Sequence, residues 1–356
     1  MEEALELALK GIEGVSPNPL VGAVLVHRGR VIGRGYHRRY GGPHAEQAAL
    51  CDAGRCAGAD LYVTLEPCSH HGRTPPCSTA LINAGIKRVV CAIEDPDPRV
   101  QGSGLQQLRE AGIEVEIGLF REEAERQNAA YLKHRQTGLP LVILKLAQTL
   151  DGQIATCTAD SRWITAAKAR THAHRWRSWV DGIMVGAGTI AADDPQLDVR
   201  HVKGRDPRPM VVDGRLRTSP RARVYQRPGA VLITAASNPP SALAPFAARG
   251  AEIWAYAAPQ DRIDLRQPLA AAARQDMTSI MIEGGGDLAA AALRDQVVDQ
   301  VMIFVAPRIL GKGIAAIGNL DIDTVEDAIC LEDVRTRRLG PDVLYTARVR
   351  YPCSPD

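Results

Sequence analysis

Two short stretches organise this chain: Pro43-His44-Ala45-Glu46, and then Pro67-Cys68-Ser69-His70-His71-Gly72-Arg73-Thr74-Pro75-Pro76-Cys77. The imidazole of His44 and the thiols of Cys68 and Cys77 give three protein ligands for a zinc ion and leave the fourth tetrahedral position open to water. This is the composition of a catalytic zinc site. Glu46 lies two residues beyond His44, at the start of an expected helix, where it can move protons on the bound water without being a ligand.

The segment between the cysteines tests this interpretation. Cys68 and Cys77 could be ordinary buried thiols, but the prolines and glycine around them exclude a regular apolar element. His70 and His71 could each replace a ligand or simply line the loop, and the two roles are about equally supported. With Arg73 they offer donors for an anionic substrate. In nucleobase deaminases the pattern is H-x-E followed by P-C-x-x-C, whereas here the second cysteine comes later.

With this longer interval the motif resembles the deaminase half of the bifunctional riboflavin-biosynthesis deaminase/reductase family, in which PCSHHGRTPPC is a signature. The upstream run Ser16-Pro17-Asn18-Pro19-Leu20-Val21-Gly22 is similar to the loop that leads into the family's site. The resemblance implies a cytidine-deaminase-like α/β/α layered domain that binds Zn²⁺. It assigns the metal ligands, the catalytic acid/base and further possible contacts to His44, Cys68 and Cys77, to Glu46, and to Asn18, His70, His71 and Arg73.

Length and composition limit the remaining possibilities. At 356 residues the chain is longer than a single core usually supports, so two domains are expected. A net charge of +2 without a basic tract, together with 4% aromatic residues, argues against a nucleic-acid partner and favours a small-molecule substrate. The acidic, amphipathic first residues do not form a secretory signal, and no apolar run reaches membrane-spanning length. We therefore expect reduced cysteines, no membrane partner and a cytoplasmic location.

Helical spacing of apolar residues alternates with short apolar runs in the first half. The glycine of His27-Arg28-Gly29-Arg30 suits a tight hairpin turn. Cys77 is expected to open a helix, whose dipole favours a thiolate. The pattern predicts helices over 3–13, 105–111 and 122–136, and strands over 22–26, 31–35, 60–65, 88–93 and 113–117. Such alternation indicates a layered α/β sheet with ligands at the carboxyl ends of its strands.

Thr137-Gly138-Leu139-Pro140 breaks the pattern, and we place the domain boundary there, giving domains 1–138 and 139–356. The second half also alternates strands and helices. It predicts a helix near 166–179, and strands over 141–146, 182–185, 209–212, 231–234, 252–256, 279–283, 301–305 and 343–349.

Two glycine clusters in the second half follow strands. Val185-Gly186-Ala187-Gly188-Thr189-Ile190-Ala191 fits a dinucleotide fingerprint. However, Pro195 and the polar residues before it should break any helix almost at once, so we reject a Rossmann fold. Glu283-Gly284-Gly285-Gly286-Asp287 instead passes into an apparent helix, where backbone amides can approach a phosphate. An ordinary tight turn explains this cluster equally well when it is taken alone.

Residues 141–310 resemble the reductase half of the same family, which has a dihydrofolate-reductase-like α/β fold. Lys145–Gly152, Ser161–Thr165, Gly188–Leu197 and the Glu283 glycine run carry this resemblance. It implies NADP(H) contacts at Ala147, Trp163, Thr189, Asp193, Gly214, Gly285, Gly286, Asp287, Leu288, Ala289, Ala290 and Ala291. It also implies substrate contacts at Ser161, Arg177, Leu197, Arg200 and Glu283, with Lys145 as a possible proton carrier.

Some of these assignments depend on side-chain chemistry. Arg177 and Arg200 can each pair with a substrate phosphate as a planar fork. Arg215 and Arg217 follow an expected strand end and could accept the extra phosphate of NADP. Gly214 stands where the family suggests a side-chain donor, and it offers only backbone.

The resemblance implies two successive reactions. The first domain would be a zinc-dependent pyrimidine deaminase that hydrolytically deaminates a diaminopyrimidinone ribosylamino 5′-phosphate. The second would be an NADPH-dependent reductase that converts the ribosyl side chain of the product to ribityl. We also expect a homo-oligomer. Three alternatives stay open: a cytidine or transfer-RNA adenosine deaminase, a single-function deaminase with a degenerate reductase-like domain, and a non-enzymatic module with four protein ligands to zinc.

Overall fold

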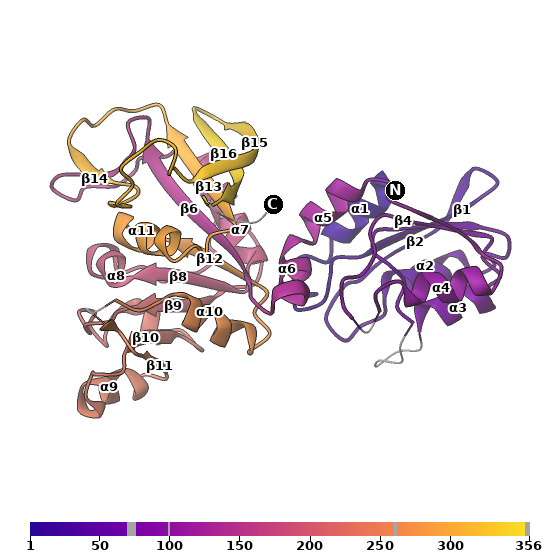
Figure 1. Cartoon of the computed structure of the whole chain (residues 1–356), viewed down its shortest axis with the longest axis horizontal. Coiled ribbons are helices and arrows are strands. Elements are labelled where there is room, and N and C mark those ends of the chain that lie inside the picture. The colour runs from indigo at the N-terminus through magenta and orange to yellow at the C-terminus, as the bar shows by residue number, and fades with distance from the viewer. Residues whose placement is uncertain (70–75, 99, 260–261, 353–356) are drawn as a thin grey trace. The chain divides into compact units, whose positions relative to one another are not determined.

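The chain divides into two compact units, Met1–Leu139 and Pro140–Asp356. The computed structural model describes residues 1–69, 76–98, 100–259 and 262–352 (Figure 1). Each unit has its own sheet and its own buried core, so each is described by itself.

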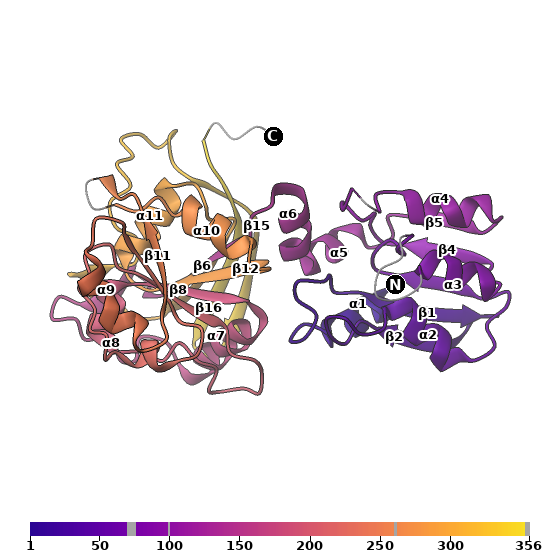
Figure 2. The same ribbon diagram turned by 90° about the horizontal axis from the view of Figure 1, so that it is seen from below.

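The first unit is built on a five-stranded sheet in the order β2-β1-β3-β4-β5. β1 runs antiparallel to β2 and β3, whereas β3, β4 and β5 are parallel. Figure 2 shows helices α2, α3 and α4 alongside these strands. The strands are β1 (Gly22–His27), β2 (Arg30–Tyr36), β3 (Asp60–Val63), β4 (Arg88–Cys91) and β5 (Glu114–Ile117). The helices are α1 (Glu2–Leu9), α2 (Ala45–Ala53), α3 (Cys77–Asn83), α4 (Ser103–Glu110), α5 (Arg121–Gln127) and α6 (Ala129–Thr137).

The predicted hairpin brings helix α2 close to the sheet. Arg28 and Gly29 at the turn both have positive φ, 49° and 75°, as a tight hairpin requires. A Cβ at Gly35 in β2 would lie only 2.1 Å from the carbonyl oxygen of Ala45 in α2. Glycine at this position therefore lets the amino end of α2 pack directly against the strand.

The single charged helix predicted over 122–136 is wrong. The segment forms two helices, α5 and α6, that meet at Asn128. The Asn128 side chain is buried, and it accepts a hydrogen bond from the Leu20 amide at 2.8 Å and donates one to the Leu20 carbonyl at 2.9 Å. The junction of the two helices is thus tied to Leu20 by a tertiary contact, which charge patterning alone could not reveal.

The second unit is built on a nine-stranded sheet in the order β11-β10-β9-β8-β12-β6-β13-β16-β15. The strands from β11 to β13 are parallel, and β16 and β15 continue antiparallel. The strands of the sheet are β6 (Leu141–Thr149), β8 (Gly182–Gly186), β9 (Arg208–Val212), β10 (Val231–Ala235), β11 (Glu252–Tyr256), β12 (Ser279–Glu283), β13 (Gln300–Ala306), β15 (Cys330–Leu339) and β16 (Asp342–Arg350). The α-helices are α7 (Ala167–Trp179), α8 (Ala187–Asp193), α9 (Pro240–Ala247), α10 (Arg266–Ala273) and α11 (Gly286–Arg294).

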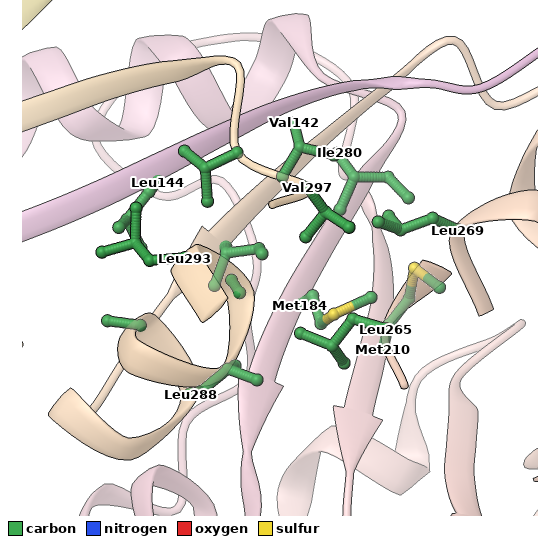
Figure 3. Close-up of a cluster of buried hydrophobic side chains, with 14 of the residues drawn as sticks. Val142, Leu144, Met184, Met210, Leu265, Leu269, Ile280, Leu288, Leu293 and Val297 are labelled. Carbon is green, nitrogen blue, oxygen red and sulfur yellow. The ribbon is translucent and has the colours of Figure 1, made fainter. Parts of the chain in front are cut away.

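The core of this unit joins central strands to two helices. Figure 3 shows Leu144, Met184 and Ile280 from three strands, with Leu269 of α10 and Leu293 of α11 in the same cluster. Leu144 is 1% exposed, and Met184 and Ile280 are fully buried. Burial on both faces explains why these strands are continuous apolar runs in the sequence.

Three features of the second unit differ from the sequence interpretation. A helix, α8, does start directly after β8, although it ends at Asp193, next to the expected break. The short strands β7 (Gln153–Thr156) and β14 (Gly313–Ala315) pair with each other, and neither was predicted. Strand β15 was not predicted because nearly all its side chains are exposed or half-exposed, which hides strand periodicity. Among the helices of the described part of the chain, none is long and apolar enough to cross a membrane.

Candidate active sites

The three predicted metal ligands converge in the first unit. His44 is the residue before α2, Cys68 follows β3, and Cys77 is the first residue of α3. The Nδ1 atom of His44 lies 3.5 Å from Sγ of Cys68 and 3.3 Å from Sγ of Cys77. All three ligand atoms lie within 4.8 Å of one another. One imidazole and two thiols in this arrangement fit a zinc ion and provide three of its four positions.

The protonation of these groups suits a cation. The hydrogen bond from Cys77 lowers the pKa of Cys68, with further help from His44, and the same contact raises the pKa of Cys77. The Cys77 amide also donates to Cys68 Sγ at 3.4 Å. These opposite shifts favour a thiolate at Cys68, and a bound cation would favour a thiolate at Cys77 as well.

Glu46 lies behind this cluster on the first turn of α2. Its side chain is only 3% exposed, and burial raises its pKa to about 7. It also hydrogen-bonds to Cys77. A carboxyl group that can gain or lose a proton near neutrality is suited to general acid/base work.

The loop that carries Cys68 is held by a carboxylate that the sequence analysis missed. Buried Glu66 accepts hydrogen bonds from the amides of Asp95 (3.2 Å), Gly102 (3.0 Å) and Gly104 (2.9 Å). A Cβ at Gly104 would lie 1.9 Å from the Pro67 carbonyl oxygen, so the amino end of α4 packs directly against the loop. These contacts fix the backbone next to Cys68. Glu66 showed no local signal, because its partners are about thirty or more positions away in the sequence.

His37 is a second missed residue. It is 3% exposed, its Nδ1 lies 2.9 Å from the Pro43 carbonyl, and its Nε2 lies 3.0 Å from Nδ2 of Asn18. Since a carbonyl only accepts, Nδ1 carries the proton and Nε2 accepts from Asn18. The ring stands edge-on to His44 at 5.5 Å between centroids. The structure thus places Asn18 beside the cluster through His37. The predictions for His70, His71 and Arg73 fall outside the described residues.

The second unit contains a cavity of about 1120 Å³ at the carboxyl ends of β8, β9 and β12. Most of the predicted cofactor and substrate residues line it. From the cofactor set these are Ala147, Trp163, Thr189, Asp193, Gly214, Gly285, Gly286, Asp287, Leu288 and Ala291. From the substrate set they are Ser161, Arg177, Leu197, Arg200 and Glu283, and Lys145, Arg215 and Arg217 join them. Ala289 and Ala290, each 1% exposed, do not line it, because they face the interior from α11.

Arg177 and Glu283 form a buried ion pair at the base of the cavity. Arg177 donates from Nε and Nη2 to the two carboxylate oxygens at 2.9 and 2.8 Å, and Lys145 Nζ lies 3.7 Å from the same carboxylate. Burial alone raises the pKa of Glu283, but the charges of Arg177 and Lys145 outweigh it and hold the pKa well below its ordinary value. The planar fork of Arg177, expected to face a phosphate, is therefore engaged by Glu283.

The glycine run between β12 and α11 adopts a turn that requires its small residues. Gly284 has φ 137°, and a Cβ there would lie 2.6 Å from Oγ1 of Thr189. The Gly285 amide donates to that hydroxyl at 3.2 Å. By contrast, a Cβ at Gly285 would meet nothing within 4 Å. Gly285 thus faces open space on the cavity side.

Other cavity residues had not been predicted. His174 of α7 is 6% exposed, and its ring is perpendicular to that of His201, with 4.5 Å between centroids. Arg170 lies over the ring of exposed Trp163, 4.4 Å from its centroid. The only sequence signal for Arg170 and His174 was their spacing on the same helix as Arg177.

Comparison with known proteins matches both units. Residues 1–93 match the cytidine and deoxycytidylate deaminase zinc-binding region, and residues 140–345 match the RibD C-terminal domain. The riboflavin biosynthesis protein RibD of Escherichia coli (strain K12) is 40% identical over 358 residues, which cover 96% of each chain. The chain belongs to the RibD family. RibD of Bacillus amyloliquefaciens is 39% identical over 353 residues, covering 98% of this chain and 95% of its own.

Solved RibD structures agree over the same length. Form 1 of Acinetobacter baumannii RibD has a TM-score of 0.87 at 35% identity and covers 98% of this chain and 97% of its own. A Thermotoga maritima diaminohydroxyphosphoribosylaminopyrimidine deaminase/5-amino-6-(5-phosphoribosylamino)uracil reductase has a TM-score of 0.85 at 34% identity, with the same coverage. These matches confirm the predicted family and the α/β fold class of both units.

Proposed function

We propose that this chain is a bifunctional enzyme of riboflavin biosynthesis. The unit Met1–Leu139 would deaminate 2,5-diamino-6-(5-phosphoribosylamino)pyrimidin-4(3H)-one, and the unit Pro140–Asp356 would reduce the ribosyl side chain of the product with NADPH. The observation that carries the proposal is that full-length RibD relatives, including one named for these two activities, match both units together. A single-function deaminase with a degenerate second domain is not favoured.

In the first unit, His44, Cys68 and Cys77 would hold zinc, which when bound supplies a water molecule acidified to near neutral pKa. Glu46 would take the proton of this water and pass protons to the ring nitrogen and to the leaving ammonia. Its burial and its contact with Cys77 keep it close to the metal cluster and away from bulk water.

In the second unit, the cavity would align the nicotinamide of NADPH with the ribosyl carbon that receives hydride. The glycine run and the amino end of α11 would bind the cofactor phosphates through the amides that follow Gly285, whose own amide is bound to Thr189. Ala289 and Ala290 would support this helix from inside without touching NADP(H).

The substrate phosphate needs a cation that is accessible from the cavity and is not held in a buried ion pair. Because Glu283 engages the Arg177 fork, Arg200 is the better candidate, since half of its side chain is exposed and it lines the cavity. Arg177 would instead orient Glu283 toward the substrate. The exposed Arg215 and Arg217 line the same cavity and would accept the extra phosphate that distinguishes NADPH from NADH.

We also propose a cytoplasmic location and a homo-oligomeric state. All cysteines in the described part of the chain are free thiols, which suits a reducing compartment. The long edge strand β15 offers an unpaired backbone edge for self-association. Sedimentation velocity of the purified protein would measure the oligomeric state directly.

The decisive experiment is mass spectrometry of the diaminopyrimidinone phosphate after incubation with the zinc-loaded protein. We expect exchange of an amine for oxygen without NADPH, and addition of two hydrogens only when NADPH is present. NADH in place of NADPH tests the role of Arg215 and Arg217, and it should support much slower reduction. If the deaminated product is never reduced, the proposal for the second unit is wrong.

The variant Glu46→Gln tests the first unit. It should keep zinc, because Glu46 is not a proposed ligand, and it should lose deamination by at least about 100-fold. Zinc content by atomic absorption and turnover by mass spectrometry are measured on the same sample. Undiminished deamination in a zinc-loaded variant would exclude Glu46 as the proton carrier.

A further inference from the structure

The segment between α8 and β9, residues 194–207, contains neither helix nor strand, yet it carries four cavity residues, among them Leu197 and Arg200. Its backbone is held by side chains from other elements. Arg227 Nη1 donates to the carbonyls of Gln196 and Leu197 at 3.1 and 2.7 Å. Within the segment, the Val199 amide donates to Asp206 at 2.7 Å.

Helix α7 supplies the remaining two contacts. Arg177 Nη1 donates to the Asp198 carbonyl at 3.0 Å, and Nδ1 of His174 accepts from the Arg200 amide at 3.2 Å. His174 and Arg177 are three residues apart, so they lie on the same face of the helix. Every residue from 196 to 200 therefore has one backbone group held by a side chain. The bond at residue 200 is the one made by His174.

The bond to Arg200 requires the neutral form of His174, with the proton on Nε2, because an amide only donates. Burial lowers the pKa of His174 to about 4, with further lowering by Arg177, His201 and Arg200 and an opposing effect from Glu283. The ring of His201 packs edge-on against it. His174 is therefore a hydrogen-bond acceptor at neutral pH, in surroundings that disfavour its protonation.

The position of this bond matters because Arg200 has little else to hold it. Half of its side chain is exposed, and its Nε lies 3.3 Å from Oδ1 of Asp198. The direction of the side chain into the cavity thus depends on where its backbone is held. We propose that His174 is a positioning residue of the reductase site, which holds Arg200 in place to pair with the phosphate of the substrate. This inference rests on the proposed function of the second unit.

The test compares three full-length variants, each with one substitution, and a double variant that combines His174→Ala with Arg200→Ala. His174→Ala removes the acceptor, His174→Asn restores an acceptor oxygen near the position of Nδ1, and Arg200→Ala removes the cation. Reduction by NADPH is measured with the deaminated ribosylamino phosphate and with the same compound lacking its phosphate. For His174→Ala we expect KM for the phosphorylated substrate to rise roughly ten-fold, with little change for the dephosphorylated one or for NADPH.

His174→Asn should recover most of the lost affinity, and His174→Ala should add little to Arg200→Ala because both act on the same contact. Little-changed reduction of the dephosphorylated substrate shows that the second unit is folded, and unchanged deamination by the same samples shows that the first unit is unaffected. Equal losses on both substrates, or additive losses in the double variant, would overturn the role through Arg200. If the unsubstituted protein does not reduce the phosphorylated substrate at all, the proposed function fails instead.

Discussion

At the scale of single residues, the Arg177–Glu283 pair shows how a site residue also stabilises the fold. Charge from Arg177 and Lys145 holds the pKa of Glu283 below the ordinary value of 4.5, against the effect of burial. The unfolded chain therefore takes up a proton at this carboxylate more readily than the folded chain does. The stabilisation is complete above the unfolded pKa and is lost as the pH falls through the folded pKa.

We predict that Glu283→Gln destabilises the second unit by about 2–3 kcal/mol at neutral pH, because Arg177 stays buried without its counter-charge. The difference from the unsubstituted protein should begin to narrow below about pH 5 and continue to narrow as the pH falls toward the folded pKa, because the native carboxylate gradually loses its advantage. Urea unfolding followed by tryptophan fluorescence measures this selectively, since Trp163, Trp176, Trp179 and Trp254 all lie in the second unit.

Glu326→Gln is the matched control, because Glu326 is an exposed carboxylate in the same unit as Glu283. It should change stability by less than about 0.5 kcal/mol. A Glu283→Gln protein that is as stable as this control at neutral pH would show that the buried pair contributes nothing.

The residues that the sequence identified are those whose chemistry is visible locally. His44, Cys68 and Cys77 were found because thiols flanked by prolines and an H-x-E pattern are informative without knowledge of the fold. His37, Glu66 and His174 were missed because each acts through a hydrogen bond to a distant backbone or side chain, and such bonds appear only once the chain is folded.

At the scale of elements, the junction of α5 and α6 depends on a contact that the sequence pattern does not show. We predict that Asn128→Ala destabilises the first unit by about 3 kcal/mol, because it leaves the amide and carbonyl of Leu20 buried without partners. Hydrogen exchange measured by mass spectrometry should show faster exchange in α1, α5 and the segment around Leu20. Gln136→Ala, at an exposed position of α6, is the control and should leave exchange unchanged.

The turn into α11 gives a second prediction. A Cβ at Gly286 would lie 2.5 Å from the Ala315 carbonyl oxygen, so Gly286→Ala should destabilise the second unit by about 2 kcal/mol. Gly285→Ala, one residue earlier, adds its methyl group to open space and should be close to neutral for stability. Thermal unfolding followed by tryptophan fluorescence compares the two. Equal melting temperatures would show that the strand and helix can separate to admit the methyl group.

Elements were predictable where burial gives a clear period. The parallel strands β8, β10 and β12 were located closely because they are continuous apolar runs in the sequence. The short pair β7 and β14 was not, since its strands are three and four residues long and its partners lie far apart in the chain. Helix α8 was underestimated because Pro195 does not prevent a short helix, here of seven residues, from forming before it.

At the scale of the whole molecule, two successive reactions are assigned to two units with separate sheets and separate cores. Sequence length suggested two domains, but strand order was not accessible from the sequence. Strand β12 lies between β8 and β6 although it follows both in the chain. That insertion brings Glu283 at the end of β12 next to Lys145 of β6 and within reach of Arg177. A pattern that identifies each strand does not reveal which neighbour it acquires.

Because each unit has its own core, inactivating one site should leave the other working in the same chain. We predict that two full-length variants, each defective at one site, together complete both reactions. Glu46→Gln removes deamination, and Gly285→Leu places a bulky side chain in the open space beside the glycine run, where it should exclude NADPH without straining the backbone. Neither variant alone should form the reduced product from the diaminopyrimidinone phosphate, whereas an equimolar mixture should do so after a lag, as the deaminated intermediate diffuses between molecules.

Mass spectrometry over time measures the lag and the final yield. A mixture that accumulates the deaminated intermediate without reducing it, while Glu46→Gln alone reduces the added intermediate, would mean that the product stays bound to the unit that made it and that the two sites must work within one protein.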